Sequence, residues 1–209
     1  MLQRYSNIQR ELRAGWNIFV SVVAINAYTA TRVFAVGLLT NNIITGYYSI
    51  AERIAGVIQS FPLDSLAQAL YPRLNKIYKR NKDRAAKLMK RIQDSATFGF
   101  MVCLPVIYIA TPLIVRLVCG SPYSEVIMTL RLLLLSVFLV GANAFRVQFL
   151  LVCGKPNLYS RLHLIAAILG LPLIFVCIYR FTFLGAAMAS ILIEAGILLA
   201  TFRMIKRFT

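Results

Sequence analysis

Six long apolar stretches constrain the fold of this chain more than any other feature. They cover residues 15–39, 43–70, 96–118, 124–152, 159–180 and 183–203. Each reaches or exceeds the roughly 20 residues that a helix needs to cross a bilayer. The apolar runs also lack the regular alternation with polar residues that a transmembrane strand shows. We therefore predict an all-α integral membrane protein, in which residues 1–209 form one bundle of about six transmembrane helices.

The composition supports this fold class. Hydrophobic residues make up 59% of the chain and charged residues 14%, whereas soluble domains carry about 25% charged residues. The net charge of +16 would suggest a nucleic-acid partner in a soluble protein. Basic residues also orient membrane helices, however, and here they gather in particular connectors. We therefore expect no nucleic-acid partner.

Residues 72–95 form the one long connector and contain nine Lys and Arg residues. Their apolar positions recur every three or four residues, as on one face of a helix: Leu74, Ile77, Tyr78, Ala85, Leu88, Met89 and Ile92. The spacing predicts a basic amphipathic helix that lies on the cytoplasmic surface against anionic lipid headgroups. A solvated basic linker is the alternative interpretation.

The distribution of basic residues predicts the orientation of the chain. If the N-terminus is cytoplasmic, residues 72–95, the connector at 153–157 and the C-terminus lie on the same side. Most of the chain's Lys and Arg residues then face the cytoplasm, including Arg4, Arg10, Arg13, Lys206 and Arg207. The opposite connectors contain no Lys or Arg. The positive-inside rule therefore predicts that both termini are cytoplasmic.

Ionisable residues within the apolar stretches are candidate functional sites, because they are costly in a bilayer. The candidates are Arg32, Glu52, Arg53, Asp64, Arg131, Arg146 and Glu194. Arg32 lies nine residues before Asn41 and Glu52 lies eleven after it, so their depths differ by only about 3 Å at 1.5 Å per residue. A similar count places Arg146 and Glu194 at one depth. Each pair fits a structural ion pair as well as a functional site facing a water-filled cavity.

No motif indicates an enzyme, a cofactor or a metal site. The four cysteines form no CxxC pair, and His163 is the chain's single histidine, which leaves the usual zinc-ligand sets incomplete. Glycine-rich nucleotide-binding motifs and the common hydrolase motifs are also missing from the sequence. We therefore expect a protein with no cofactor and no catalytic residues.

Several segments between Leu12 and Tyr78 resemble the bacterial O-antigen and polysaccharide flippases. They are Leu12-Arg13-Ala14-Gly15-Trp16, Gly37-Leu38-Leu39-Thr40-Asn41-Asn42, Gly46-Tyr47-Tyr48-Ser49-Ile50-Ala51-Glu52-Arg53-Ile54 and Ala69-Leu70-Tyr71-Pro72-Arg73-Leu74. These flippases belong to the multidrug/oligosaccharidyl-lipid/polysaccharide exporter superfamily. The resemblance implies twelve spans in two six-span bundles around a cavity that is often cationic, and this chain is similar to the second bundle.

The resemblance implies flipping of undecaprenyl-pyrophosphate-linked oligosaccharides across the bacterial inner membrane, with this chain as a half-transporter or fragment. A second six-span bundle, from a homodimer or a separate half, is then the expected partner. From depth and charge, we expect Arg32, Arg53 and Arg146 to bind the substrate, and Glu52, Asp64 and Glu194 to bind a coupling proton or cation. A cation-coupled drug exporter of the same superfamily and a non-transporting membrane scaffold are the alternatives.

Overall fold

The computed structural model describes residues 2–205, and the side chains of residues 15–204. Within these residues the chain forms six helices and no strand. The helices are α1 (Leu2–Leu39), α2 (Asn42–Arg80), α3 (Lys82–Cys119), α4 (Ser124–Gly141), α5 (Ala144–Val152) and α6 (Pro156–Ile205). The side chains of Arg4, Arg10, Arg13, Lys206 and Arg207, which contribute to the predicted orientation, lie outside the described ones. The all-α prediction is confirmed.

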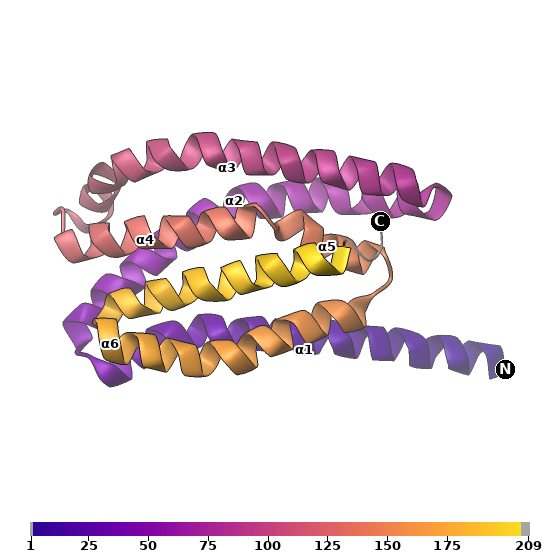
Figure 1. Ribbon diagram of the computed structural model, residues 1–209, viewed down its shortest axis with the longest axis horizontal. Coiled ribbons are helices and arrows are strands. Elements are labelled where there is room, and N and C mark those ends of the chain that lie inside the picture. The colour runs from indigo at the N-terminus through magenta and orange to yellow at the C-terminus, as the bar shows by residue number, and fades with distance from the viewer. Residues whose placement is uncertain (1, 206–209) are drawn as a thin grey trace.

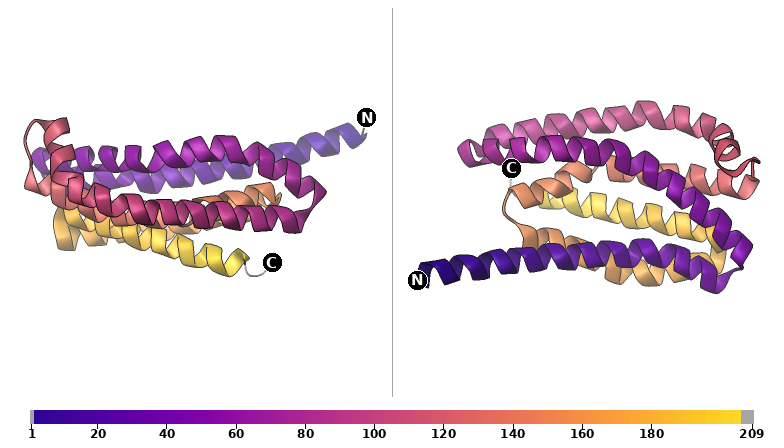
Figure 2. Two further views of the ribbon diagram at one scale, coloured as in Figure 1. Left: turned by 90° about the horizontal axis from the view of Figure 1, so that it is seen from above. Right: turned by 180° about the vertical axis from the view of Figure 1, so that it is seen from behind.

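The helices lie side by side along the long axis of the molecule (Figure 1). The N-terminus, the α2–α3 turn, the α5–α6 connection and the C-terminal end of α6 lie at one end of the bundle (Figure 2). The turns near Asn41, Gly120 and Thr182 lie at the opposite end. Connectors rich in Lys and Arg thus share one end, as the charge distribution predicts.

α6 is two antiparallel half-helices joined at Thr182. Its φ of 53° and ψ of −137° are non-helical, and the chain reverses direction there. The turn is very tight: a Cβ atom on Gly185 would overlap the carbonyl oxygen of Cys177. Glycine at 185 therefore allows the two backbones to approach closely. The predicted boundary between the fifth and sixth apolar stretches is confirmed.

Four helical segments among the described residues are long and apolar enough to cross a membrane. They are Gly15–Leu39, Lys82–Cys119, Ser124–Val152 and the bent Pro156–Met204. The remaining predicted span, residues 43–70, lies within α2. This helix is long enough but more polar, because it carries Glu52, Arg53 and Asp64.

The prediction of one amphipathic helix over residues 72–95 is wrong. α2 continues to Arg80 and α3 begins at Lys82, so the segment is a helical hairpin that extends both helices along the bundle axis. Asn81 is extended (φ −153°, ψ 110°), and its side chain caps α3 by accepting a hydrogen bond from Arg84 N at 2.8 Å. The apolar positions pack between the two arms and against α5, where Leu74, Ala85, Met89, Phe149 and Val152 form a small core. A spacing of three and four residues does not distinguish this hairpin from one continuous helix.

The apolar stretch 124–152 is also interrupted, between Gly141 and Ala144. Gln93, buried on α3, bridges the interruption: its Nε2 donates to Gly141 O at 2.9 Å. Its Oε1 accepts hydrogen bonds from the backbone N–H groups of Phe145 (3.1 Å) and Arg146 (3.3 Å). The Gln93 side chain thus provides hydrogen-bond partners for backbone groups at the end of α4 and the start of α5, where partners within the helix are missing.

Two larger apolar cores hold the bundle together. The first joins α1 to both halves of α6 and includes Tyr28, Val36, Ile174, Ile178 and Ile193. The second joins α2, α3 and α4 and includes Ala55, Phe100, Leu104, Leu130 and Leu134. The first core surrounds the charged residues described next.

Candidate functional site

An ion pair between Arg32 and Glu52 lies inside the bundle. Arg32 Nη2 of α1 is 2.8 Å from Glu52 Oε1 of α2, and the two side chains are only 14% and 21% exposed. Arg32 Nη1 also donates a hydrogen bond of 2.6 Å to Ser190 Oγ, on the second half of α6. The prediction that Arg32 and Glu52 meet on facing helices is confirmed.

Polar side chains at a spacing of four residues extend this charged cluster. On α6, Glu194 follows Ser190 by one helical turn, and its carboxylate interacts electrostatically with Arg32. On α1 and α2, Tyr28 and Tyr48 each precede a charged member of the cluster by four residues, and both are buried. Residues four apart share a helix face, so three helices direct polar side chains into one space. We call Tyr28, Arg32, Tyr48, Glu52, Ser190 and Glu194 the charged cluster.

The charged cluster contains one guanidinium and two carboxyl groups. Arg32 contacts Glu52 directly, whereas Glu194 has only a longer-range attraction to Arg32. If both carboxyl groups are ionised, the cluster carries one uncompensated negative charge among apolar residues, which is unfavourable. Binding a proton or a monovalent cation would neutralise it. The arrangement is therefore suited to holding one positive charge near Glu194.

Arg146 lies outside the charged cluster. Its guanidinium carbon stands 4.4 Å from the centre of the Phe202 ring, and Nη1 donates to Ala142 O at 2.8 Å. The carboxylate of Asp94 also attracts the Arg146 guanidinium electrostatically. Phe202 follows Glu194 by eight residues, or about 12 Å along α6 at 1.5 Å per residue. The predicted proximity of Arg146 and Glu194 is therefore not observed. The depth count assumed that both residues stand equally far from the inner ends of their helices, but α5 ends at Val152, six residues after Arg146, whereas α6 continues for eleven residues beyond Glu194.

Arg53 and Asp64 belong to a third group, on the outside of α2. Arg53, Ser60, Asp64 and Gln68 recur at intervals of seven and four residues, and all four are exposed. We call these four residues the polar stripe. The helix buries other positions, including Ala51, Ala55 and Leu63. Lipid chains cannot satisfy polar groups on an exposed helix face, so the polar stripe requires water or another protein surface beside it.

Metal binding is not indicated by the described residues. No group of three or more His, Cys, Asp or Glu side chains in that part of the chain could hold a metal ion. His163 is buried with both ring nitrogens unpaired, and its ring contacts Tyr159 with centroids 4.7 Å apart.

Comparison with known families gives a decisive match. The family model described as "Polysaccharide biosynthesis protein" matches residues 3–128, more than half of the chain. The chain belongs to this polysaccharide biosynthesis family. The match includes α1, α2 and α3, and therefore the Arg32–Glu52 pair and the polar stripe.

Two curated relatives extend the comparison of this family member. A protein of Escherichia coli (strain K12) named "Putative O-antigen transporter" is 24% identical over 189 residues, covering 90% of this chain and 45% of the relative. A protein of the same name from Shigella dysenteriae is 23% identical over 204 residues, covering 97% of this chain and 50% of the relative. The chain thus spans about half the length of these relatives. No solved structure matches it significantly.

The family membership and the apolar helices together establish the location. This polysaccharide biosynthesis protein is a multi-pass protein of the bacterial inner membrane.

Sequence reasoning missed three groups of the charged cluster and the bridge at Gln93. Ser190 was detectable, because it stands four residues before the intramembrane Glu194 in an otherwise apolar helix. Tyr28 and Tyr48 were detectable in the same way, because each stands four residues before a charged residue, Arg32 and Glu52 respectively. Gln93 gave no such signal, since its partners are backbone groups about 50 residues away in the sequence.

Proposed function

We propose that this chain forms one half of a transporter that flips lipid-linked oligosaccharide repeat units across the inner membrane. The polar stripe carries the proposal, because a polar helix face at membrane depth fits the wall of an aqueous path. Both curated relatives are named as O-antigen transporters, which supports the same substrate class. The chain would act without catalytic residues.

In this proposal the chain crosses the membrane six times, with both termini in the cytoplasm. α2 counts as a span despite its polarity, because its polar stripe faces the path instead of lipid. The second wall comes from another six-span bundle, either a second copy of this chain or a separate half. Anionic headgroups contact the basic hairpin at residues 72–95, where nine basic side chains accompany Asp83 and Asp94.

The two sets of charges have different roles in the proposed mechanism. Arg53 on the polar stripe attracts the pyrophosphate or an acidic sugar, and Asp64 binds a coupling cation at the same surface. The guanidinium groups of Arg32 and Arg146 already contact other groups of the protein. Their role in this mechanism is to orient the helices along which the substrate moves. A proton or cation at Glu52 or Glu194 changes the charge between α1, α2 and α6. That change favours rocking of one bundle against the other.

Thiol accessibility tests the aqueous path. Ser60→Cys places a thiol on the polar stripe, and Val106→Cys places one on the exposed apolar face of α3. In cells, a charged, water-soluble thiol reagent should modify the first and leave the second unmodified. Equal protection of both positions would contradict the proposed path.

A transport assay tests the substrate. The chain is co-expressed with a first-bundle partner in cells that lack their own O-antigen flippase. Arg53→Ala should lower surface polysaccharide at least tenfold, whereas Arg116→Ala, near the end of α3, should not. Export of a cationic dye without restored polysaccharide would favour a drug exporter. Intact polysaccharide with Arg53→Ala would contradict the role of the polar stripe.

A further inference from the structure

Arg131, near the middle of α4, is an arginine at membrane depth without a protein counter-charge. Among the described residues no carboxylate lies within ion-pair distance of it, and its buried Nε has no hydrogen-bond partner. Its guanidinium carbon stands 4.8 Å from the centre of the Tyr108 ring on α3, and a ring face compensates a charge less fully than an anion does. Arg32 and Arg146, by contrast, each donate a hydrogen bond to the protein. The environment of Arg131 therefore favours binding of an anion.

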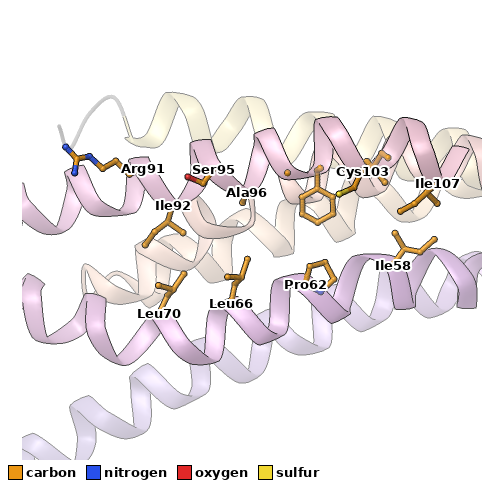
Figure 3. Close-up of a pocket in the computed structure, with 13 residues that line it drawn as sticks. Ile58, Pro62, Leu66, Leu70, Arg91, Ile92, Ser95, Ala96, Cys103 and Ile107 are labelled. Carbon is orange, nitrogen blue, oxygen red and sulfur yellow. The ribbon is translucent and has the colours of Figure 1, made fainter.

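Two grooves border α3, one against α2 and one against α4. The groove against α2 has an apolar lining, and the Arg91 guanidinium at its end is directed away from that lining (Figure 3). It therefore offers no charge that selects a ligand. The second groove, which we call the α3–α4 groove, contains Arg131. It has two parts, with volumes of about 640 and 660 Å³, and both parts include Tyr108, Arg131 and Leu132.

The two parts of the α3–α4 groove differ in polarity. The part nearer the turn at Gly120 includes Ser124, which shares a face of α4 with Arg131 because seven residues separate them. The part that runs toward the middle of the bundle adds only apolar side chains, among them Leu135 and Phe138. The carboxylate of Glu125 accepts a hydrogen bond of 3.0 Å from Ser124 and lines neither part. A positive charge above an apolar channel is complementary to a phosphate attached to a hydrocarbon chain.

The depth of Arg131 is compatible with contact to a lipid phosphate. It lies seven residues after Ser124, or about 10 Å along α4. Its side chain leans toward the N-terminal end of that helix, where headgroups extend about 5–7 Å beyond the hydrocarbon core. From Arg131 to Phe138 the apolar part covers another seven residues, or about 10 Å, which is less than the roughly 15 Å of one leaflet. The α3–α4 groove therefore fits a phospholipid of a single leaflet.

We propose that the α3–α4 groove binds an anionic phospholipid, with its phosphate at Arg131 and an acyl chain along the apolar part. A headgroup with a net negative charge binds better than a zwitterionic one, because an attached ammonium group cancels part of the attraction. In the proposed orientation the lipid belongs to the periplasmic leaflet, opposite the basic hairpin. It supplies the counter-charge for Arg131 and is a component of the bilayer, so the site does not depend on the proposed transport.

Fluorescence quenching by lipids with brominated acyl chains tests the occupant. Trp16→Phe removes the single tryptophan, and Leu135→Trp places a reporter at an exposed position of the groove. In phosphatidylcholine vesicles, brominated phosphatidylglycerol should bind beside this reporter about fivefold more tightly than brominated phosphatidylcholine. Ile168→Trp, at an exposed position of α6, should show no preference. Equal binding of the two lipids at Leu135→Trp would overturn the proposal.

Variants at Arg131 test the phosphate contact. Arg131→Gln should remove the preference, and Arg131→Lys should retain most of it. Arg116→Gln is the matched control, because Arg116 is exposed in the last turn of α3 and does not line the groove. Phosphatidylglycerol should also stabilise the unsubstituted protein against unfolding but not Arg131→Gln. Equal loss of preference with Arg116→Gln and Arg131→Gln would show only a general attraction to basic charge and overturn the site.

Three further outcomes of the quenching experiment distinguish other occupants. Displacement of brominated phosphatidylglycerol by millimolar inorganic phosphate would show a simple anion site and overturn the lipid assignment. Tighter binding of undecaprenyl phosphate than of phosphatidylglycerol would assign the groove to a transported lipid and overturn it as well. Absence of quenching by any lipid would show that protein covers the groove, with the same consequence. Because none of these measurements uses transport, their failure leaves the proposed function intact.

Discussion

Removing the negative charge of Glu52 should destabilise the bundle by about 2–3 kcal/mol. Glu52→Gln leaves the Arg32 guanidinium among apolar residues with a hydrogen bond to Ser190 and the more distant Glu194. Breaking a fully buried ion pair costs about 3–5 kcal/mol, and a central arginine in a membrane helix costs about 2.5–3.5 kcal/mol. The remaining exposure of 14% and 21% and the contact with Ser190 reduce the expected cost.

Reversible unfolding in mixed detergent micelles measures this free energy. Glu125→Gln is the control, because Glu125 lies at the start of α4 and accepts a hydrogen bond from the exposed Ser124; its change should stay below about 0.5 kcal/mol. The double variant Arg32→Met with Glu52→Leu should recover most of the lost stability, since a hydrophobic replacement of both partners is often neutral. Equal unfolding free energies for Glu52→Gln and Glu125→Gln would refute the reasoning.

Three further predictions follow from the helix ends and turns. Gln93→Leu should lower the unfolding free energy by about 2–3 kcal/mol, because three backbone groups at the α4–α5 interruption lose their partner. Gly185→Ala should destabilise by at least about 2 kcal/mol, since its Cβ would overlap the facing backbone of α6, whereas Gly196→Ala has open space and should be nearly neutral. A reagent outside the cell should modify Ser121→Cys but not Lys82→Cys, and the reverse pattern would refute the proposed orientation.

Much of the fold was predictable, because the bilayer restricts the chain to a few solutions. Long apolar runs indicate helices, and short connectors make consecutive helices antiparallel. Counting residues from the turn at Asn41 also predicted correctly that Arg32 and Glu52 lie at the same depth and meet, because both residues lie close to that turn. Errors in helix geometry accumulate little over nine to eleven residues.

The same arithmetic did not bring Arg146 and Glu194 together, because their helices end at different distances from them. α5 ends six residues after Arg146, whereas α6 continues for eleven residues beyond Glu194. The interruption at 142–143 was missed as well. Gly141 and Asn143 are weak helix formers, but Gln93, which bridges the interruption, is distant in the sequence. The hairpin at Asn81 was missed for a related reason. Its apolar residues keep a helical spacing across the turn, so periodicity alone gives no signal of the reversal.

The charge imbalance of the charged cluster leads to a last prediction, with a result different from that of Glu52→Gln. Arg32 contacts Glu52 directly, so Glu194 is the carboxyl group with the weaker compensation. Glu194→Gln keeps the side-chain volume, leaves the Arg32–Glu52 pair intact and removes the uncompensated charge. We therefore expect the unfolding free energy to change by less than about 1 kcal/mol, or to rise.

Transport should respond differently from stability. If Glu194 holds the coupling proton or cation, Glu194→Gln should remove the dependence of polysaccharide export on the ion gradient while the protein stays folded. Ser190→Ala is the matched control, because it changes a neighbouring contact of Arg32 without changing the charge. A loss of stability with Glu194→Gln equal to that with Glu52→Gln would show that Arg32 depends on both carboxyl groups equally. Glu194 would then be a structural partner, because a carboxylate already committed to Arg32 has no free charge with which to bind a coupling ion.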